Sequence, residues 1–372
     1  MAAPRVLVLG AGYAGVTAAK LIAKRGGATV TLVNAREHFQ ERMRNHQLAS
    51  GRRPRDLPLS SLIKRDPIGL VIDRVTRIDL EGRRVELASD AEPIGYDTLI
   101  YALGSQADLG AVPGAAEHAT AIATAEQAQR VHEQLRSAAS IAVVGGGLTG
   151  IETVAELAEN YPDREVRLIT RDAPGGMLNN RSREHLAGAF DRLGIDVHTE
   201  ATVAKVGHRS LLLDDGNHVE ADAVVWTTGF GVPALAREAG LSVDERGRIL
   251  VDPTLRSISH PDVYGVGDAA AARNERGDEL RMGCGPGGIA AVVGALAITD
   301  RLSDRTPRPL RYEDHAWHIS LGRRDGIVQL GGDDRGRVIT GRPAAFIKER
   351  VLRGSVWGLK HPAVGVFGAK RF

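Results

Sequence analysis

Cysteine and aromatic residues are scarce in this chain, and each scarcity excludes a class of function. The 372-residue sequence contains one cysteine, Cys284, so no disulfide can form within it. That excludes a disulfide-stabilised secreted fold and a C-x-x-C redox centre. Aromatic residues make up 4% of the sequence, too few for a surface that stacks single-stranded nucleic acid. The formal net charge of +2 gives no excess that would attract nucleic acid either.

Long hydrophobic runs are missing as well. No uninterrupted apolar run reaches about 18 residues, the length that a membrane-spanning helix requires. The first residues, Met1 to Arg5, lead directly into an apolar strand and do not fit a signal peptide. We therefore expect a cytoplasmic protein without a membrane-spanning segment. The length predicts two or three domains.

The sequence does contain the same glycine pattern twice. The apolar run Val6–Leu9 leads into Gly10-Ala11-Gly12-Tyr13-Ala14-Gly15, and Ile141–Val144 leads into Gly145-Gly146-Gly147-Leu148-Thr149-Gly150. In each G-x-G-x-x-G motif the first glycine permits a tight turn, the second lets the backbone approach a pyrophosphate, and the third lets a helix pack on a strand. The helix N-terminus then binds the anion. Two copies predict two bound dinucleotides and electron transfer between them.

The segments after each motif also repeat. After the first motif we predict a helix, a strand, a β-hairpin and a buried strand, over residues 16–24, 28–33, 70–87 (turning at Glu81-Gly82) and 98–104. After the second we predict a strand over 166–169, a hairpin broken at 214–217 and a strand ending at Trp226. The fold class is therefore α/β: two Rossmann-like dinucleotide-binding domains plus a small α+β C-terminal domain. The predicted boundaries are 1–111 with 236–305, 112–235, and 306–372.

The order of these signals resembles the two-dinucleotide flavoprotein family of type II NADH dehydrogenases, apoptosis-inducing-factor-like quinone reductases, ferredoxin reductases and glutathione-reductase-like enzymes. The resemblance covers nearly the whole chain. It rests on the two glycine motifs, the second running into Gly150-Ile151-Glu152, and on Tyr101-Ala102-Leu103-Gly104-Ser105 and Val266-Gly267-Asp268-Ala269. It implies an FAD-dependent oxidoreductase that passes electrons from NAD(P)H through the flavin to a quinone-type acceptor.

The resemblance assigns the first motif to FAD. The residues expected around the pyrophosphate, the ribitol and the flavin are Gly10, Gly12, Tyr13, Ala14, Gly15, Val75, Ala102, Leu103, Gly104, Gly267 and Asp268. For Asp268, a plain helix N-cap is the alternative. Asn34 occupies the place where an acid normally holds the adenosine ribose, and an amide can still hydrogen-bond a hydroxyl. Arg42 and Gln47 fall where related reductases contact FAD and the flavin edge, with a solvated helix face as the alternative. His46, on a polar stretch, is more typical of a surface histidine than of a catalyst.

The resemblance assigns the second motif to a nicotinamide dinucleotide, with Gly145, Gly147, Leu148, Thr149, Gly150 and Gly229 as the expected contacts. Thr170 and Arg171 take the place of Asn34 and could accept a 2′-phosphate, whereas Asp172, which would favour NADH, lies two positions late. NADH and NADPH therefore both stay open. Glu152 resembles a residue beside the nicotinamide and the acceptor, where it could relay a proton. A charge that complements the helix macrodipole is the alternative.

Other features bear on the acceptor and on partners. A ferredoxin reductase would need a basic docking patch, which Arg323-Arg324 and Arg350-Arg353 could form, and a redox sensor with little turnover is a third alternative. The segment 345–353 has apolar and basic faces and precedes Trp357, Phe367 and Phe372 among basic residues, which suits weak peripheral contact with the inner face of a membrane. A tail packed on the flavin domain, with Trp357 in the core, is equally open. We expect a monomer or homodimer, no metal, and a structural rather than redox role for Cys284.

Overall fold

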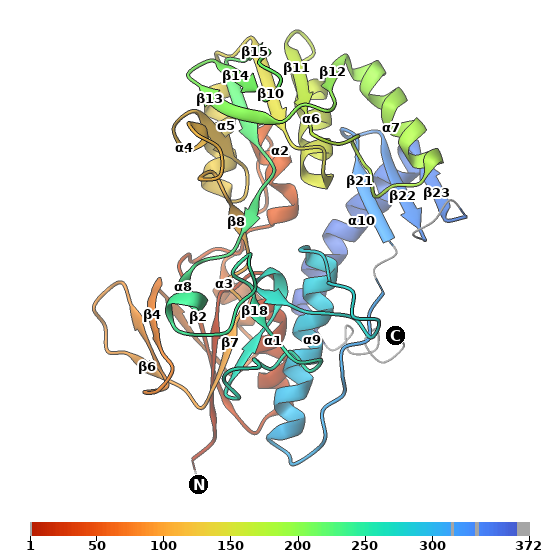
Figure 1. The fold of residues 1–372 in the computed structure, drawn as a ribbon. Helices are drawn as coiled ribbons and strands as arrows, with labels where there is room; N and C mark the ends of the chain where they lie inside the picture. The colour runs from red at the N-terminus through yellow and green to blue at the C-terminus, as the bar shows by residue number, and fades with distance from the viewer. Residues whose placement is uncertain (1, 314–315, 332–334, 363–372) are drawn as a thin grey trace.

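Two parallel five-stranded sheets form the framework of the protein, in a computed structural model that describes residues 2–313, 316–331 and 335–362. The first sheet has the order β19 (Val263–Gly265), β7 (Thr98–Tyr101), β1 (Arg5–Leu9), β2 (Thr29–Asn34) and β3 (Ile68–Ile72). The second has the order β12 (Ile195–His198), β11 (Glu165–Ile169), β10 (Ser140–Val144), β16 (Ala223–Trp226) and β9 (Ala119–Ala121). The predicted pair of Rossmann-like α/β units is confirmed. Figure 1 shows them as the lower and upper halves of the molecule.

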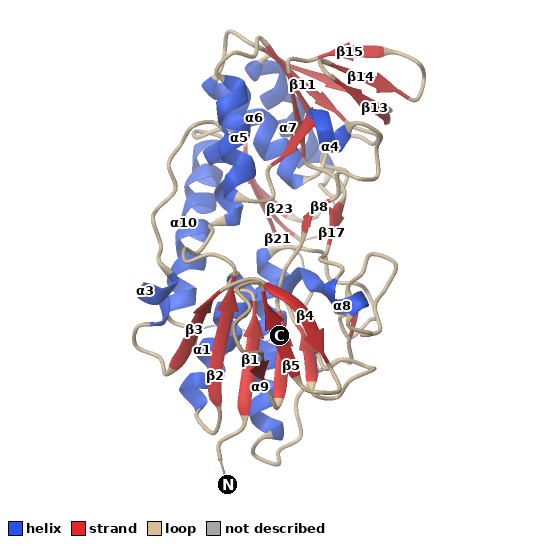
Figure 2. Ribbon diagram, turned by 90° about the vertical axis from the view of Figure 1, so that its left-hand side faces the viewer, coloured by secondary structure: helices blue, strands red, loops and turns tan. Residues whose placement is uncertain are grey.

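Each sheet has helices on one face and a three-stranded antiparallel sheet on the other, because side chains alternate along a strand. In the first unit Val6 and Val8 pack against α1 (Tyr13–Arg25) and α9 (Cys284–Arg301). Leu7 and Leu9 face β4 (Val75–Asp79) and β5 (Arg84–Leu87), which pair with each other. Strand β5 also pairs with β6 (Ile94–Gly95). Figure 2 shows β4 and β5 in the lower half of the molecule.

The second unit repeats this plan. Ile141 and Val143 pack against α5 (Ala125–Leu135), α6 (Leu148–Asn160) and α7 (Asn180–Leu193). Ala142 and Val144 face the sheet of β13 (Val203–Gly207), β14 (Ser210–Leu213) and β15 (His218–Glu220). The internal duplication therefore includes both faces of the sheets.

The third unit is an antiparallel sheet of β21 (Ala316–Ser320), β22 (Gly326–Leu330) and β23 (Arg337–Thr340), covered by α10 (Gly341–Lys360). The shorter elements are η1 (Arg42–Arg44), α2 (Asn45–Ala49), α3 (Leu59–Ile63), β8 (Gln106–Ala107), α4 (Ala115–His118), β17 (Phe230–Gly231), α8 (Leu235–Glu238), β18 (Ile249–Leu250), η2 (Gly267–Ala269) and β20 (Ala270–Ala271). Strands β8 and β17 pair where the chain passes between the two large units, and α2 of the first packs on α5 and α6 of the second. The domain boundaries stay a prediction.

One predicted element is placed differently. Residues 70–72, predicted as part of a hairpin, belong to β3 of the parallel sheet, where Val33 pairs with Val71. The hairpin starts only at Val75, which pairs with Leu87. A short apolar run has the same pattern in a parallel strand and in a hairpin, so the sequence could not separate the two.

Candidate functional site

The first glycine motif forms an open turn between β1 and α1. Gly10 has φ +95°, and a Cβ there would lie 2.5 Å from the Ala102 carbonyl oxygen. A Cβ on Gly15 would lie 1.8 Å from the Gly10 carbonyl oxygen. The fold therefore requires both glycines. A Cβ on Gly12, in contrast, would meet no atom within 4 Å, and α1 begins after it without a side-chain cap. Space and free amide donors for an anion are present at this helix N-terminus.

The second motif has the same geometry. Gly145 has φ +118°, and a Cβ on Gly150 would lie 1.8 Å from the Gly145 carbonyl oxygen. A Cβ on Gly147 would meet nothing within 4 Å. Leu148 and Thr149 open α6 directly after it. Gly229, between β16 and β17, has φ +67°. The chain thus has two equivalent places for a pyrophosphate.

Asn34 and Thr170, at the ends of β2 and β11, both hold the loop that follows the strand. The Asn34 Oδ1 accepts a hydrogen bond from the Ala11 amide at 2.9 Å, and its Nδ2 donates to the Arg36 carbonyl at 2.7 Å. The Thr170 Oγ donates to the Asp172 carbonyl at 2.9 Å and lies where a Cβ on Gly146 would be. Each of these groups keeps further hydrogen-bonding capacity for a ligand.

Arg171 stays accessible, with 78% of its side chain exposed and its Nε 3.1 Å from the Asp172 carboxylate. Both residues lie at the edge of the second glycine motif, directly after the end of β11.

Asp268 lies at the centre of a polar cluster near the first glycine motif. Its Oδ2 accepts from the Ser105 hydroxyl at 2.7 Å, and its Oδ1 accepts from the Gly283 amide at 2.8 Å. The Arg42 Nη1 donates to the Ser105 carbonyl at 2.7 Å and lies 3.8 Å from the Asp268 Oδ2. The helix N-cap alternative for Asp268 is wrong, because residues 270 and 271 form a strand. The structure brings Arg42, the Leu103-Gly104 strand end and the Gly267-Asp268 turn together.

Three buried polar atoms of the first unit have no hydrogen-bond partner among the described residues: the Tyr13 hydroxyl, the Gln47 Nε2 and the Glu41 Oε1. Buried polar groups are normally paired, so these atoms are suited to a ligand. Burial raises the pKa of Tyr13, which keeps its hydroxyl a donor. Gln47 is 7% exposed, so the alternative of a solvated helix face is wrong for this residue.

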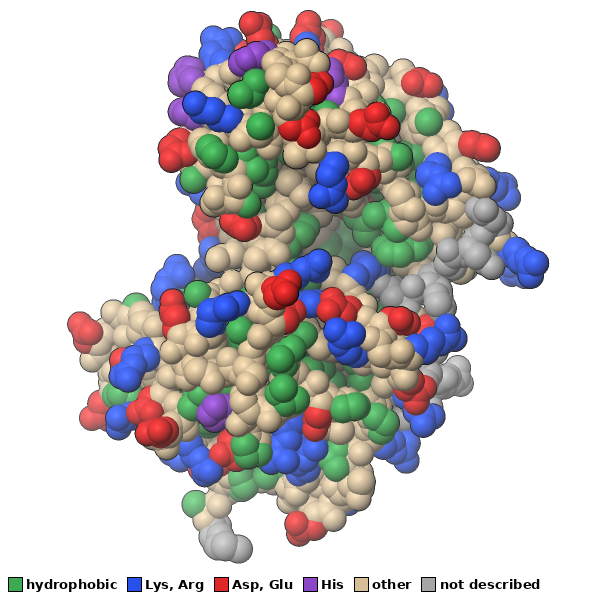
Figure 3. Space-filling model, viewed as in Figure 1, with side chains coloured by type: hydrophobic (Ala, Val, Ile, Leu, Met, Phe, Trp, Pro, Cys, Tyr) green, Lys and Arg blue, Asp and Glu red, His purple; other side chains and the backbone are tan. Residues whose placement is uncertain are grey.

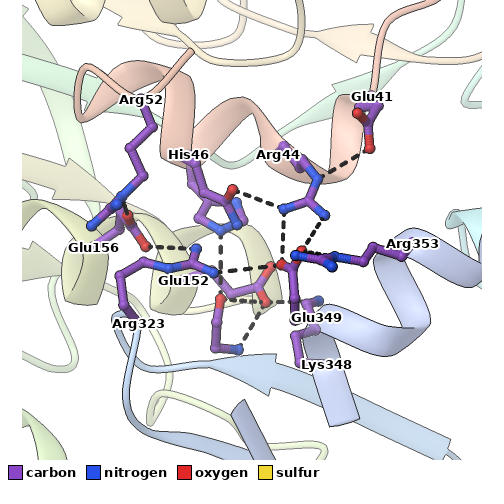
Figure 4. A network of polar contacts seen from close by, with 12 residues as sticks. Glu41, Arg44, His46, Arg52, Glu152, Glu156, Arg323, Lys348, Glu349 and Arg353 are labelled. Atoms are coloured by element: carbon purple, nitrogen blue, oxygen red, sulfur yellow. Dashed lines mark hydrogen bonds and ion pairs between the residues drawn. The ribbon is translucent and has the colours of Figure 1, made fainter. Parts of the chain in front are cut away.

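Glu152 is buried at the junction of the three units (Figure 4). Its Oε1 accepts from the Lys348 Nζ at 2.8 Å, from the Ser320 amide at 2.9 Å and from the Ser320 hydroxyl at 3.0 Å. Burial raises the pKa of this carboxyl, but the charge of Lys348 and the hydrogen bonds outweigh burial and leave the pKa below its usual value. Glu152 is the fifth residue of α6 and therefore lies beyond the first turn. The helix macrodipole acts most strongly within the first turn.

A network of ion pairs surrounds Glu152 and joins the segment from η1 to Arg52 with α6 and α10. Both oxygens of Glu349 accept from Arg44, at 2.9 and 3.0 Å, and Oε1 also accepts from Arg353 at 2.8 Å. Burial raises the pKa of Glu349, but these arginines outweigh it and lower the pKa to about 2. Arg323 lies 3.6 Å from Glu349 and 3.5 Å from Glu156. Arg323 and Arg353 are paired with carboxylates. These two residues of the basic patch expected for ferredoxin docking are therefore neutralised.

Three residues of this site were missed in the sequence. His46 is 4% exposed, so the expectation of a surface histidine is wrong. Ser320 was not predicted, and Lys348 was predicted only as part of the amphipathic segment 345–353. No local signal marks them, because their partner Glu152 is 168 and 196 positions away in the sequence. Only the packing of the third unit on α6 brings them to Glu152.

Cys284 and the C-terminal segment can also be placed. Cys284 is the first residue of α9, and burial raises the pKa of its thiol to about 12, which disfavours the reactive thiolate. Trp357 is 51% exposed, so its expected alternative place in the core is wrong. Phe367 and Phe372 lie outside the described residues. Within the described ranges, no helix has the length and apolar content to cross a bilayer.

A hollow separates the two large units on the face shown in Figure 3, with hydrophobic side chains on its wall and basic side chains at its rim. Each glycine motif thus leaves open space at a helix N-terminus, and the carboxylate of Glu152 lies buried where the units meet.

Comparisons with known proteins give one family. A family model described as pyridine nucleotide-disulphide oxidoreductase matches residues 4–297. An NADH dehydrogenase-like protein of Mycobacterium tuberculosis is 30% identical, over 93% of this chain and 92% of that protein. A type II NADH:quinone oxidoreductase of Staphylococcus haemolyticus is 29% identical, over 93% of each. The solved structure of NDH2 from Plasmodium falciparum in complex with NADH matches with a TM-score of 0.84 and 14% identity, over 99% of this chain and 98% of that one.

Proposed function

The chain belongs to the pyridine nucleotide-disulphide oxidoreductase family, and from this premise we propose that it is an FAD-dependent enzyme that passes electrons from NAD(P)H to a quinone-type acceptor. Relatives that match over nearly the whole chain are named NADH dehydrogenase-like protein and type II NADH:quinone oxidoreductase. One observation carries the proposal. The Ser320 hydroxyl is contacted by Glu152 and by His46. Glu152 lies on the helix that follows the second glycine motif, and His46 lies in the segment that follows the first. The two nucleotide units thus share one buried polar centre.

The residues of the first unit fit FAD. The amides at the N-terminus of α1 would hold its pyrophosphate, and the open space at Gly12 admits it. Asp268 would bind the ribitol, and the unpartnered Gln47 Nε2 and Tyr13 hydroxyl would donate to polar atoms of the cofactor. When bound, FAD supplies hydride acceptance from the nicotinamide and electron transfer to the acceptor.

The second unit would bind the nicotinamide dinucleotide as substrate. Gly147 leaves the space that a pyrophosphate needs, and Arg171 stands exposed at the strand end where the adenosine ribose would lie. An arginine there can pair with a 2′-phosphate, and without that phosphate it can remain with Asp172.

Glu152 would deliver the proton that a quinone needs to become a quinol. In the arrangement described, the carboxylate is ionised and bonded to Lys348. The ammonium and a proton compete for the same oxygen, so Glu152 takes up a proton only when Lys348 releases it. The C-terminal unit, which carries Lys348, would therefore control the protonation of Glu152.

The acceptor is not a disulfide within this sequence, because Cys284 has no second cysteine with which to pair. Two alternatives remain to be tested: a ferredoxin-type reductase and a redox sensor with little turnover. The experiment is steady-state oxidation of NADH and of NADPH by the purified holoprotein with menadione, a long-chain quinone, ferredoxin or oxygen. We expect turnover with quinones of about ten per second or more. Faster turnover with ferredoxin, or negligible turnover with every acceptor, would contradict the proposal.

We further propose weak peripheral contact of α10 with a membrane surface. Phe346 and Trp357 are 66% and 51% exposed on this helix, and the basic residues Arg350 and Lys360 are also exposed. Exposed aromatic and basic side chains on one helix suit the boundary of anionic lipids. Co-sedimentation with anionic vesicles tests this: replacing both aromatic residues by serine should lower the bound fraction, while unchanged binding would contradict the contact.

A further inference from the structure

We propose that His46 exchanges protons with Glu152 through the hydroxyl of Ser320 and so reloads Glu152 after each proton transfer to the acceptor. The proposal rests on the proposed function, because it concerns the same buried centre. It assigns roles to two residues that no sequence signal marks.

The three groups form a chain across three elements. The His46 Nε2 lies 3.5 Å from the Ser320 Oγ, and that Oγ lies 3.0 Å from the Glu152 Oε1. His46 comes from α2 of the first unit, Glu152 from α6 of the second, and Ser320 from the end of β21 in the third. His46 and Ser320 are each 4% exposed and Glu152 is 9% exposed. Figure 4 shows His46 directed toward Glu152 from the opposite side of the site.

The donor count fixes how these groups can bond. A hydroxyl has one proton to donate and an ionised carboxylate has none. While Glu152 is ionised, Ser320 therefore donates to Glu152 and can only accept from His46, whose Nε2 must carry a proton. When Glu152 is protonated, it can donate to Ser320, which then donates to an unprotonated His46 Nε2. Ser320 thus supports both directions of transfer.

The transfer step is balanced. Once Lys348 has released the Glu152 Oε1, a proton leaves the Nε2 of a His46 imidazolium for the Ser320 Oγ, while the Ser320 hydroxyl proton moves to the Glu152 Oε1. One N–H and one O–H bond break, two O–H bonds form, and the pair changes from imidazolium and carboxylate to imidazole and carboxylic acid. His46 then regains its proton from water. The His46 ring must first approach Ser320 by roughly 0.6 Å, since typical N–H···O distances are about 2.9 Å.

The charges around His46 determine when it takes up a proton. Burial is the largest influence and lowers the pKa of His46, the carboxylates of Glu152 and Glu156 on α6 raise it, and Lys348 on α10 and Arg323 after β21 lower it. The resulting pKa is below the usual value, so His46 is neutral at rest. It would gain a proton when negative charge accumulates nearby, as it would on reduction of an acceptor bound beside Glu152.

The test uses flavin-loaded Ser320→Ala, Ser320→Thr and His46→Gln variants, with Arg52→Gln as the matched control. Arg52 joins the segment after α2 to Glu156 of α6 at 2.8 Å, so its loss weakens contact between the same two units without touching the chain of three groups. We expect Ser320→Ala and His46→Gln to slow quinone turnover about tenfold and ferricyanide reduction less than twofold, because only the quinone requires protons. Ser320→Thr, which keeps the hydroxyl, should restore quinone turnover, and Arg52→Gln should leave the ratio of the two rates unchanged.

A second measurement does not depend on turnover. The ¹⁵N-histidine spectra of the oxidised holoprotein report which ring nitrogen of His46 carries the proton, and the His46 signal is the one missing from the spectrum of His46→Gln. In the wild type and in Ser320→Thr, His46 should carry its proton on Nε2. In Ser320→Ala, His46 should lose that preference. An unchanged tautomer in Ser320→Ala, equal slowing of both acceptors, or an equal effect of Arg52→Gln would each overturn the relay. If His46→Gln fails to hold flavin, the comparison of Ser320→Ala with Ser320→Thr decides whether the relay exists. Failure of the wild type to reduce any quinone would instead overturn the proposed function.

Discussion

Gly147→Val should remove the response to nicotinamide while leaving the fold and the flavin in place. Gly147 has φ −77° and ψ −179°, which valine adopts without strain, and no atom lies within 4 Å of the position of a new Cβ. The free energy of unfolding should therefore change by less than about 1 kcal/mol.

The loss of dinucleotide affinity can be worked from the same geometry. The new side chain fills the space where backbone amides approach the pyrophosphate, and each hydrogen bond to a charged group is worth about 1.5–3 kcal/mol. Losing two such bonds costs at least about 3 kcal/mol, which corresponds to a Kd for NADH raised more than 100-fold.

The assay is anaerobic stopped-flow reduction of the flavin over a range of NADH concentrations, together with the melting temperature and the flavin absorbance. Two matched variants bracket the result. Gly12→Val, equally free of contacts, should lose flavin instead, and Gly150→Val should fail to fold because its Cβ would lie 1.8 Å from a carbonyl oxygen. Unchanged NADH dependence in Gly147→Val, or loss of flavin together with NADH binding, would refute the reasoning.

Three further predictions concern single charges. Glu152→Gln should slow quinone turnover at least tenfold and ferricyanide reduction less than twofold, since only the quinone takes up protons; equal effects would leave Glu152 a positioning role only. Arg171→Glu should lower the ratio of kcat/KM for NADPH to that for NADH about tenfold, because a carboxylate repels a 2′-phosphate; an unchanged ratio would show that Arg171 does not contact the dinucleotide. Glu349→Gln should lower the melting temperature at pH 7. Because the folded pKa of Glu349 is lowered to about 2 from 4.5, its stabilisation is complete above about pH 4.5 and is lost as the pH falls toward 2, so the difference between wild type and variant should shrink over that range. A difference that stays constant down to pH 3 would contradict this.

The glycines could be read from the sequence because the backbone itself requires them. Gly10 and Gly15 are fixed by a positive φ and by a close carbonyl contact within a few residues, so a local pattern is sufficient. The order of apolar segments likewise predicted both parallel sheets. Asp268 was found because it lies in a local pattern of its own, Val266-Gly267-Asp268-Ala269.

The polar centre around Glu152 could not be read in the same way. Its chemistry depends on Ser320 and Lys348, which reach it only when a separate sheet and helix pack on α6. Burial of His46 depends on the contact of α2 with the second unit. Thr170 was predicted as a group that could accept a 2′-phosphate; its hydroxyl donates to the Asp172 carbonyl, a bond that the sequence did not indicate. The sequence determines which groups are present, and tertiary packing determines which of them meet.

The placement of α9 also has a consequence for synthesis of the protein on the ribosome. Helix α9 packs on α1, and β19 completes the first sheet beside β7, yet both are translated after the whole second unit. Between residue 111 and residue 301 the ribosome adds 190 residues, which takes roughly 10–40 s at about 5–20 residues per second. During that interval the apolar face of α1 lacks its cover, and over its last 75 residues, from Trp226 to Arg301, the second unit already has all of its strands. The nascent chain should therefore be able to recognise a nicotinamide nucleotide before it can retain flavin, and flavin capture should be among the last events of its maturation.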